Sequence, residues 1–148
     1  MPKHKSDSSA QQAAEVFLLR SLAETIGASF LFDASLPINL GVRPDGIDLE
    51  KKIVVEAYAR VGTLKGAQLH KAKADLLKLA YIRRMLGDEW RAIVCFGSKE
   101  AAAFLLGKSW AAQAARVFGI EIFIQELPPD QRESVLSAQR EQRMVNWE

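Results

Sequence analysis

The segment 52–59 constrains the fold more than any other part of the chain. It reads Lys-Ile-Val-Val-Glu-Ala-Tyr-Ala, and the strand that it predicts carries apolar side chains on both faces. Such a strand is typical of the interior of a sheet that helices cover on both sides. Glu56 stands in the middle of this strand, and a carboxylate buried there needs a partner, because desolvating an unpaired charge is costly.

Helices and strands alternate through the rest of the chain in the way that such a sheet requires. Hydrophobic periodicity predicts helices over 13–26, 67–86, 99–118 (where Gly107 offers a break point) and from Asp130 to about Met144. Further strands are predicted over 29–33, 42–49, 90–96 and 120–127. The resulting order, α-β-β-β-α-β-α-β-α, indicates an α/β fold with helices on both faces of one sheet.

The domain organisation follows from this order. We expect a disordered lead-in over 1–12, one α/β domain over 13–127 and a C-terminal helical tail over 128–148. A chain of 148 residues, 49% of them hydrophobic, is large enough to bury one core. The apolar residues of the tail are too few to require docking on the same chain, so a homodimer is expected. These residues are Val135, Leu136, Met144 and Trp147.

Composition also bears on the cellular setting. No run approaches the 18 apolar residues of a membrane span, and no apolar segment typical of a secretory signal follows Met1. The single cysteine, Cys95, lies in an apolar run and is expected to be a buried thiol in a reducing compartment. We therefore expect a cytoplasmic protein without a membrane partner. The net charge of +2 permits a polyanionic partner without requiring one.

Two carboxylates are the strongest candidates for chemistry. If a turn at Glu50-Lys51 closes a hairpin, Asp45 and Glu56 face each other on neighbouring strands. Carboxylates held that close repel each other unless a cation neutralises them. Mg²⁺ or Mn²⁺ fits, because Mg²⁺ takes one or two protein carboxylates, keeps several waters and binds substrate phosphate. Glu15, on the inward stripe of the first predicted helix, could supply a third carboxylate.

The run Arg-Pro-Asp45, followed by Val-Val-Glu56-Ala-Tyr58, resembles the motif of the PD-(D/E)XK nuclease superfamily. A preceding helix with an inward Glu15 and a following helix with Gly-Ala-Gln68 extend this resemblance over most of the chain. The resemblance implies a restriction-endonuclease-like αβββαβ core with a mixed central sheet. It also implies that Asp45 and Glu56 are metal ligands, that Glu15 is an accessory acid, and that Gln68 contacts the substrate or the metal shell.

The chain departs from the family motif at Tyr58, where the family has a lysine that helps to position the attacking water and to stabilise the developing negative charge. Another cation would have to replace it in an active enzyme. Lys71, one turn after Gln68 and on the same side of the helix, is the first candidate. Lys65, in the preceding loop, is the second.

The resemblance implies a small Mg²⁺-dependent endonuclease, a metal-binding hydrolase that acts on the phosphodiester bonds of DNA, with RNA as an open alternative. A catalytically inactive nuclease-like module, kept for nucleic-acid binding or protein assembly, is the second hypothesis. Tyr58 is the residue that separates the two hypotheses.

Each candidate residue also has a purely structural interpretation. Asp45-Gly46 could form a turn, and Glu56 could belong to a buried ion pair with Arg43 or Arg60. A glutamate early in a helix, as Glu15 is, is favoured by the helix dipole. The side chain of Lys71 could be a solvated surface charge, and Gln68 a contact at the start of its helix.

Overall fold

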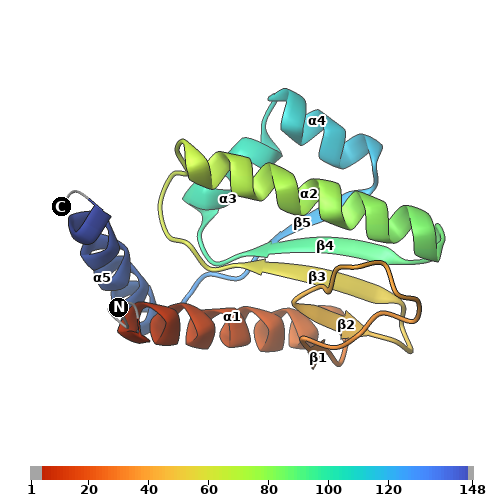
Figure 1. The fold of residues 1–148 in the computed structure, drawn as a ribbon, viewed down its shortest axis with the longest axis horizontal. Coiled ribbons are helices and arrows are strands. Elements are labelled where there is room, and N and C mark those ends of the chain that lie inside the picture. Colours follow the sequence, from red (N-terminus) through yellow and green to blue (C-terminus); the bar gives the residue numbers. More distant parts are fainter. Residues whose placement is uncertain (1–4, 147–148) are drawn as a thin grey trace.

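A mixed five-stranded sheet organises the computed structural model, which describes residues 5–146 (Figure 1). Its strand order follows the sequence. The first two pairs of neighbours are antiparallel and the last two are parallel, as a helical crossover between them requires. The strands are β1 (Leu31–Phe32), β2 (Gly46–Asp48), β3 (Ile53–Tyr58), β4 (Arg91–Phe96) and β5 (Ile120–Ile124).

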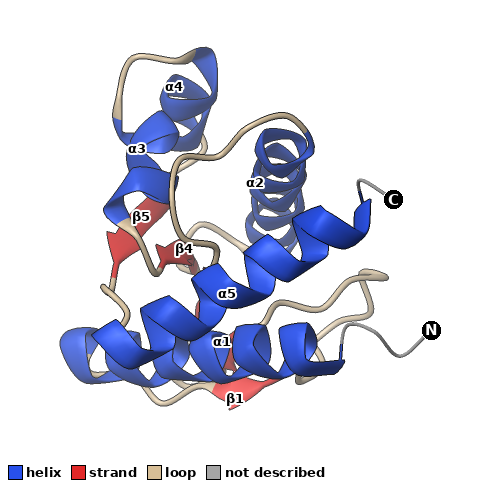
Figure 2. Ribbon diagram, turned by 90° about the vertical axis from the view of Figure 1, so that its left-hand side faces the viewer, coloured by secondary structure: helices blue, strands red, loops and turns tan. Residues whose placement is uncertain are grey.

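Helices cover both faces of this sheet, so the expected α/β architecture is confirmed (Figures 1 and 2). One face is covered by α1, with α5 packed across it, and the other by α2, α3 and α4. The helices are α1 (Lys5–Ile26), α2 (Ala67–Leu86), α3 (Lys99–Leu106), α4 (Trp110–Val117) and α5 (Pro129–Asn146). None of those helices, within residues 5–146, is long and apolar enough to cross a membrane.

The core consists of two apolar layers separated by the sheet. All six residues of β3 are buried, which explains why apolar residues occur on both of its faces. Val55 packs with the α1 layer and Val54 with the α2 layer, as the alternation of side chains along a strand requires. Cys95 is buried as expected, and burial raises the pKa of its thiol to about 12.

Several element boundaries differ from those predicted. The first helix begins at Lys5, so residues 5–12 belong to α1 rather than to a lead-in; their polar sequence gives no apolar stripe by which to detect a helix. Residues 1–4 of the predicted lead-in lie outside the described residues. β2 is shorter than 42–49, and it begins after Pro44, which has no N–H to contribute to a ladder. The predicted helix 99–118 is divided around Gly107 into α3 and α4.

The tail forms the expected helix, α5, but it is docked on its own chain. Val135 is buried and Leu136 is half-buried against the α1 layer. The side chain of Gln139 adds two hydrogen bonds to the backbone of Val61. The expectation that the tail has too few anchors for such docking is therefore wrong. Met144 is exposed, and Trp147 lies outside the described residues.

Candidate functional site

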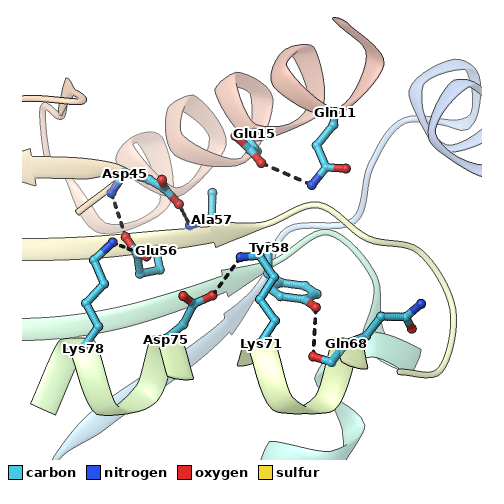
Figure 3. Close-up of polar contacts among 10 residues, drawn as sticks. All are labelled: Gln11, Glu15, Asp45, Glu56, Ala57, Tyr58, Gln68, Lys71, Asp75 and Lys78. Carbon is cyan, nitrogen blue, oxygen red and sulfur yellow. Dashed lines mark hydrogen bonds and ion pairs between the residues drawn. The ribbon is translucent and has the colours of Figure 1, made fainter. Parts of the chain in front are cut away.

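Asp45 and Glu56 lie side by side where β2 begins and β3 nears its end (Figure 3). The Asp45 backbone N–H donates a hydrogen bond to Glu56 Oε2 at 2.8 Å. The Ala57 backbone N–H donates to Asp45 Oδ2 at 2.9 Å. The expected juxtaposition of the two carboxylates is therefore observed. These bonds orient both side chains and leave the second oxygen of each outside the backbone contacts.

The hairpin between β2 and β3 produces this juxtaposition. Its antiparallel register pairs Gly46 with Val55. Asp45, which precedes Gly46, therefore lies next to Glu56, which follows Val55. Asp48 supports the turn, since its carboxylate accepts hydrogen bonds from the N–H groups of Ser29 and Lys51, both at 2.9 Å. These bonds lower the pKa of Asp48 although its burial opposes them, so Asp48 stays ionised as a structural acceptor.

The environment of Glu56 disfavours its charge. Burial and the neighbouring charge of Asp45 raise the pKa of Glu56 to about 7, and the hydrogen bond and charge of Lys78 oppose this shift. Lys78 Nζ lies 2.9 Å from Glu56 Oε1. Burial also raises the pKa of Asp45, with the Ala57 N–H acting in the opposite direction. One ammonium group thus faces two poorly solvated carboxylates, and a further cation would stabilise both of them in the ionised form.

Lys78 is the cation that sequence reasoning missed. It lies seven residues after Lys71 on α2, so the two lysines share one side of the helix. The resemblance favours Lys71 as the replacement for the family's lysine, but in the structure its ammonium contacts Asp75 at 3.4 Å and lies 5.5 Å from the Tyr58 ring centroid. Residues seven apart lie two helical turns from each other on the same side. The spacing could therefore have indicated Lys78 as a second candidate, because both lysines flank the buried side of α2.

Tyr58 and Gln68 connect the site to the start of α2. The Tyr58 ring is buried beside Phe96, and its hydroxyl donates a hydrogen bond to the backbone carbonyl of Gln68 at 3.1 Å. The side-chain Oε1 of Gln68 accepts a hydrogen bond from the Lys65 N–H at 3.2 Å. The Gln68 side chain therefore supports the helix start in this structure, and its contact with substrate or metal stays a prediction.

Glu15 lies on α1, across from the carboxylate pair (Figure 3). Burial and the charge of Asp45 raise its pKa, so the two groups are close enough to interact electrostatically. Gln11 Nε2 donates a hydrogen bond to Glu15 Oε2 at 3.4 Å. Among residues 5–146, no three His, Cys, Asp or Glu side chains are grouped closely enough to hold a metal ion. The role of Glu15 as a third metal ligand stays a prediction.

The donor set nevertheless suits a hard divalent cation. Asp45 and Glu56 supply only carboxylate oxygens, which Mg²⁺ and Mn²⁺ prefer over nitrogen or sulfur. Mg²⁺ characteristically uses one or two protein carboxylates and completes its shell with water and substrate oxygens. The pair thus fits such an ion, with Asp45 and Glu56 as the residues that would hold it.

An apolar cavity of about 890 Å³ lies on the other side of α2, against α4. Trp110 is one of its lining residues and is 69% exposed. Lys73 Nζ lies 4.9 Å from the centroid of its ring. Asp45 and Glu56 do not line this cavity, so its size does not identify the chemical site.

Comparison of the chain with protein-family models, with curated proteins and with solved structures finds no match. The geometry and electrostatics of the carboxylate pair are therefore the basis for assigning a function to this chain.

Proposed function

We propose that this protein is a small nuclease that hydrolyses phosphodiester bonds of DNA with Mg²⁺ or Mn²⁺ held by Asp45 and Glu56. The observation that carries the proposal is the pair itself. The two carboxylates come from neighbouring strands, are oriented by backbone N–H groups, and lie where burial makes a counter-cation favourable. The element order α1-β1-β2-β3-α2-β4 supports a restriction-endonuclease-like core for the same chain.

The carboxylate pair and the neighbouring lysine would have different roles in hydrolysis. A divalent cation bound to such a pair supplies a Lewis acid for the scissile phosphate and lowers the pKa of a bound water. Asp45 and Glu56 would hold that cation with the orientation that their backbone hydrogen bonds impose. Lys78, whose ammonium already lies at Glu56, is placed to stabilise negative charge that develops on a phosphate beside the pair.

Lys71 is a second candidate for contact with the phosphate. Its side chain is 67% exposed. Burial raises the pKa of both Asp45 and Glu15, and the charge of Lys71 is a smaller influence in the opposite direction, so Lys71 lies within electrostatic reach of the site. Its four-carbon stem allows the ammonium to leave Asp75 for a bound anion. Loss of a donor to the developing charge typically costs about 10²–10³ in rate, which makes the two lysines distinguishable by kinetics.

Cleavage of supercoiled plasmid with Mg²⁺ or Mn²⁺ tests the proposal. Wild type should nick the plasmid, and Glu56→Gln should not. Lys78→Ala should lower the rate about 10²–10³-fold if it replaces the motif lysine. Lys73→Ala is the matched control, because Lys73 lies against Trp110 on the other side of α2. A wild-type protein that cleaves neither DNA nor RNA with metal present would contradict the proposal.

The inactive nuclease-like module is the second candidate, and one observation favours it. Lys78 already neutralises Glu56 through a direct ion pair, so the buried carboxylate has a structural partner even without a metal. Calorimetric titration with Mn²⁺ separates the candidates. The nuclease should bind Mn²⁺ with a millimolar or tighter dissociation constant, and Glu56→Ala should abolish binding. Identical titrations of the two proteins would show that the pair is not a metal site.

A further inference from the structure

A second cavity, of about 580 Å³, lies between the β3–α2 connection and α5. Its charged lining residues are all cations: Arg60 and Lys65 from the connection, and Arg143 from α5. Its polar lining residues include the amide side chains of Gln68 and Gln139. We refer to this space as the Arg60–Arg143 cavity. A concave surface lined by guanidinium, ammonium and amide groups is suited to an anion.

Docking of α5 builds this cavity. Gln139 Oε1 accepts a hydrogen bond from the Val61 N–H at 2.9 Å, and Gln139 Nε2 donates one to the Val61 carbonyl at 3.1 Å. Arg143 lies four residues further along α5, and therefore on the same side of the helix. The two hydrogen bonds thus fix the position of Arg143 relative to the segment that carries Arg60.

The cations of this cavity have no acidic partner among the described residues. None of the ion pairs formed within that part of the chain involves Arg60, Lys65 or Arg143. Arg60 is half-buried, and its burial together with the charge of Arg143 lowers its pKa, whereas Tyr58 acts in the opposite direction. Two guanidinium groups that line one cavity without a carboxylate leave an unbalanced positive charge that a bound anion would offset.

Helix α2 carries residues of both the cavity and the carboxylate site, and Figure 3 shows Gln68 and Lys78 on this helix. Gln68 lines the cavity, and its carbonyl holds the Tyr58 hydroxyl, whose ring lies 5.5 Å from Lys71 Nζ. Lys78, at Glu56, is ten residues further along the helix, or about 15 Å at 1.5 Å per residue.

We infer that the Arg60–Arg143 cavity binds a backbone phosphate of the nucleic acid, other than the phosphate of the bond that lies at Asp45 and Glu56. The bound group is a phosphodiester, which Arg side chains recognise through paired N–H donors. Arg60 and Arg143 contact the phosphate, and Gln139 is a positioning residue that acts through Val61. The inference rests on the proposed function, because the carboxylate pair defines where the scissile bond of the nucleic acid lies.

Fluorescence anisotropy with a labelled 20-base-pair DNA, in EDTA and over a series of salt concentrations, tests the inference on the full chain. The double variant Arg60→Gln/Arg143→Gln should weaken binding at least 10-fold at low salt. Its slope of log affinity against log salt should be smaller by about 0.9, the value for one neutralised phosphate of B-DNA. Arg140→Gln is the control, since it removes a charge from α5 outside the cavity and should change affinity less than two-fold.

The outcomes separate this inference from the proposed function. A double variant that binds as tightly as Arg140→Gln, with wild-type cleavage intact, overturns the cavity assignment and leaves the nuclease proposal standing. A wild type that binds DNA through the cavity but does not cleave it with metal overturns the nuclease proposal and supports the cavity. Binding of inorganic phosphate to wild type and to the double variant is measured separately. If phosphate binds wild type but not the double variant, and the DNA affinity of both is equal, the site takes free phosphate and the phosphodiester assignment is wrong.

Discussion

Replacement of Glu56 by Gln should change the pH dependence of stability more than any other single substitution at the site. The pKa of Glu56 is raised from its ordinary value of 4.5 to about 7 in the folded protein, first by burial and then by Asp45. Between these two values the native state binds more protons than the unfolded state. The contribution of Glu56 to the free energy of unfolding therefore falls as the pH rises from 4.5 to about 7, and it is level above that range.

The magnitude follows from the two pKa values. At 1.36 kcal/mol per pH unit, the difference between 4.5 and about 7 corresponds to about 3 kcal/mol. Gln is neutral at every pH, like the protonated glutamic acid, so Glu56→Gln should match wild type near pH 4.5. Above pH 7 the variant should be more stable by about 3 kcal/mol. For a chain of this size that difference amounts to about 6–12 °C in Tm.

Urea unfolding followed by far-UV circular dichroism, at intervals from pH 4.5 to pH 8, measures this difference directly. Glu133→Gln is the control, because it removes an exposed carboxylate of α5 without touching the buried pair. The decisive quantity is the free energy of unfolding of the variant minus that of wild type. If this difference is constant with pH, or if the variant is the less stable protein at pH 8, the ion pair with Lys78 outweighs desolvation and our electrostatic account is refuted.

Two further predictions depend on the geometry described above, and a third depends on the proposed cleavage of two strands. Mn²⁺ at about 100 times its dissociation constant should raise the free energy of unfolding of wild type by about 2.7 kcal/mol, and calorimetry should find no such gain in Glu56→Gln. Gln139→Ala should lower the free energy of unfolding by about 1–3 kcal/mol, because two hydrogen bonds to Val61 are lost, and should weaken DNA binding although no charge is removed. Cutting two strands needs two sites, so the expected homodimer predicts a light-scattering mass of twice the 16.4 kDa of the chain, whereas 16.4 kDa would contradict it.

The sequence allows the carboxylate pair to be predicted because the relation between its members is local. Only a short hairpin separates Asp45 from Glu56, and the period of two along strands fixes which side chains face each other. The bounds of α2 are predictable for a similar reason, since Gly66 and Gly87, both with positive φ, flank an amphipathic stretch. Pairing, alternation and helix termination depend on neighbours that lie close in the chain.

Contacts that depend on tertiary placement were not predictable in the same way. Helical periodicity puts Lys71 and Lys78 on one side of α2. Which ammonium reaches Glu56 depends on the position of the helix along the sheet, which the sequence pattern does not give. The docking of α5 was missed because its polar anchor, Gln139, bonds to the backbone of Val61, and a count of apolar residues does not register such a contact. The polar start of α1 was missed for a related reason, because the apolar periodicity that reveals a helix lies in its later turns, where Ala14, Leu18 and Leu22 are buried.

The position of Lys78 also gives a physical reason why Tyr58 can occupy the position at which the resemblance to PD-(D/E)XK nucleases would place a lysine. Every residue of β3 is buried, and position 58 lies beside the Phe96 ring. The ammonium of a lysine at that position would be strongly desolvated, which is costly for a charge. A lysine on α2 reaches the same carboxylate from the edge of the site, and the side chain of Lys78 keeps 25% of its surface exposed. Because the ammonium of Lys78 is less desolvated, its charge costs less to maintain. Tyr58 meanwhile fills the buried position with an aromatic ring and satisfies its single hydroxyl at the Gln68 carbonyl. The cation and the packing residue are thus supplied by two elements, and the carboxylate pair retains a positive partner without a buried lysine in the strand.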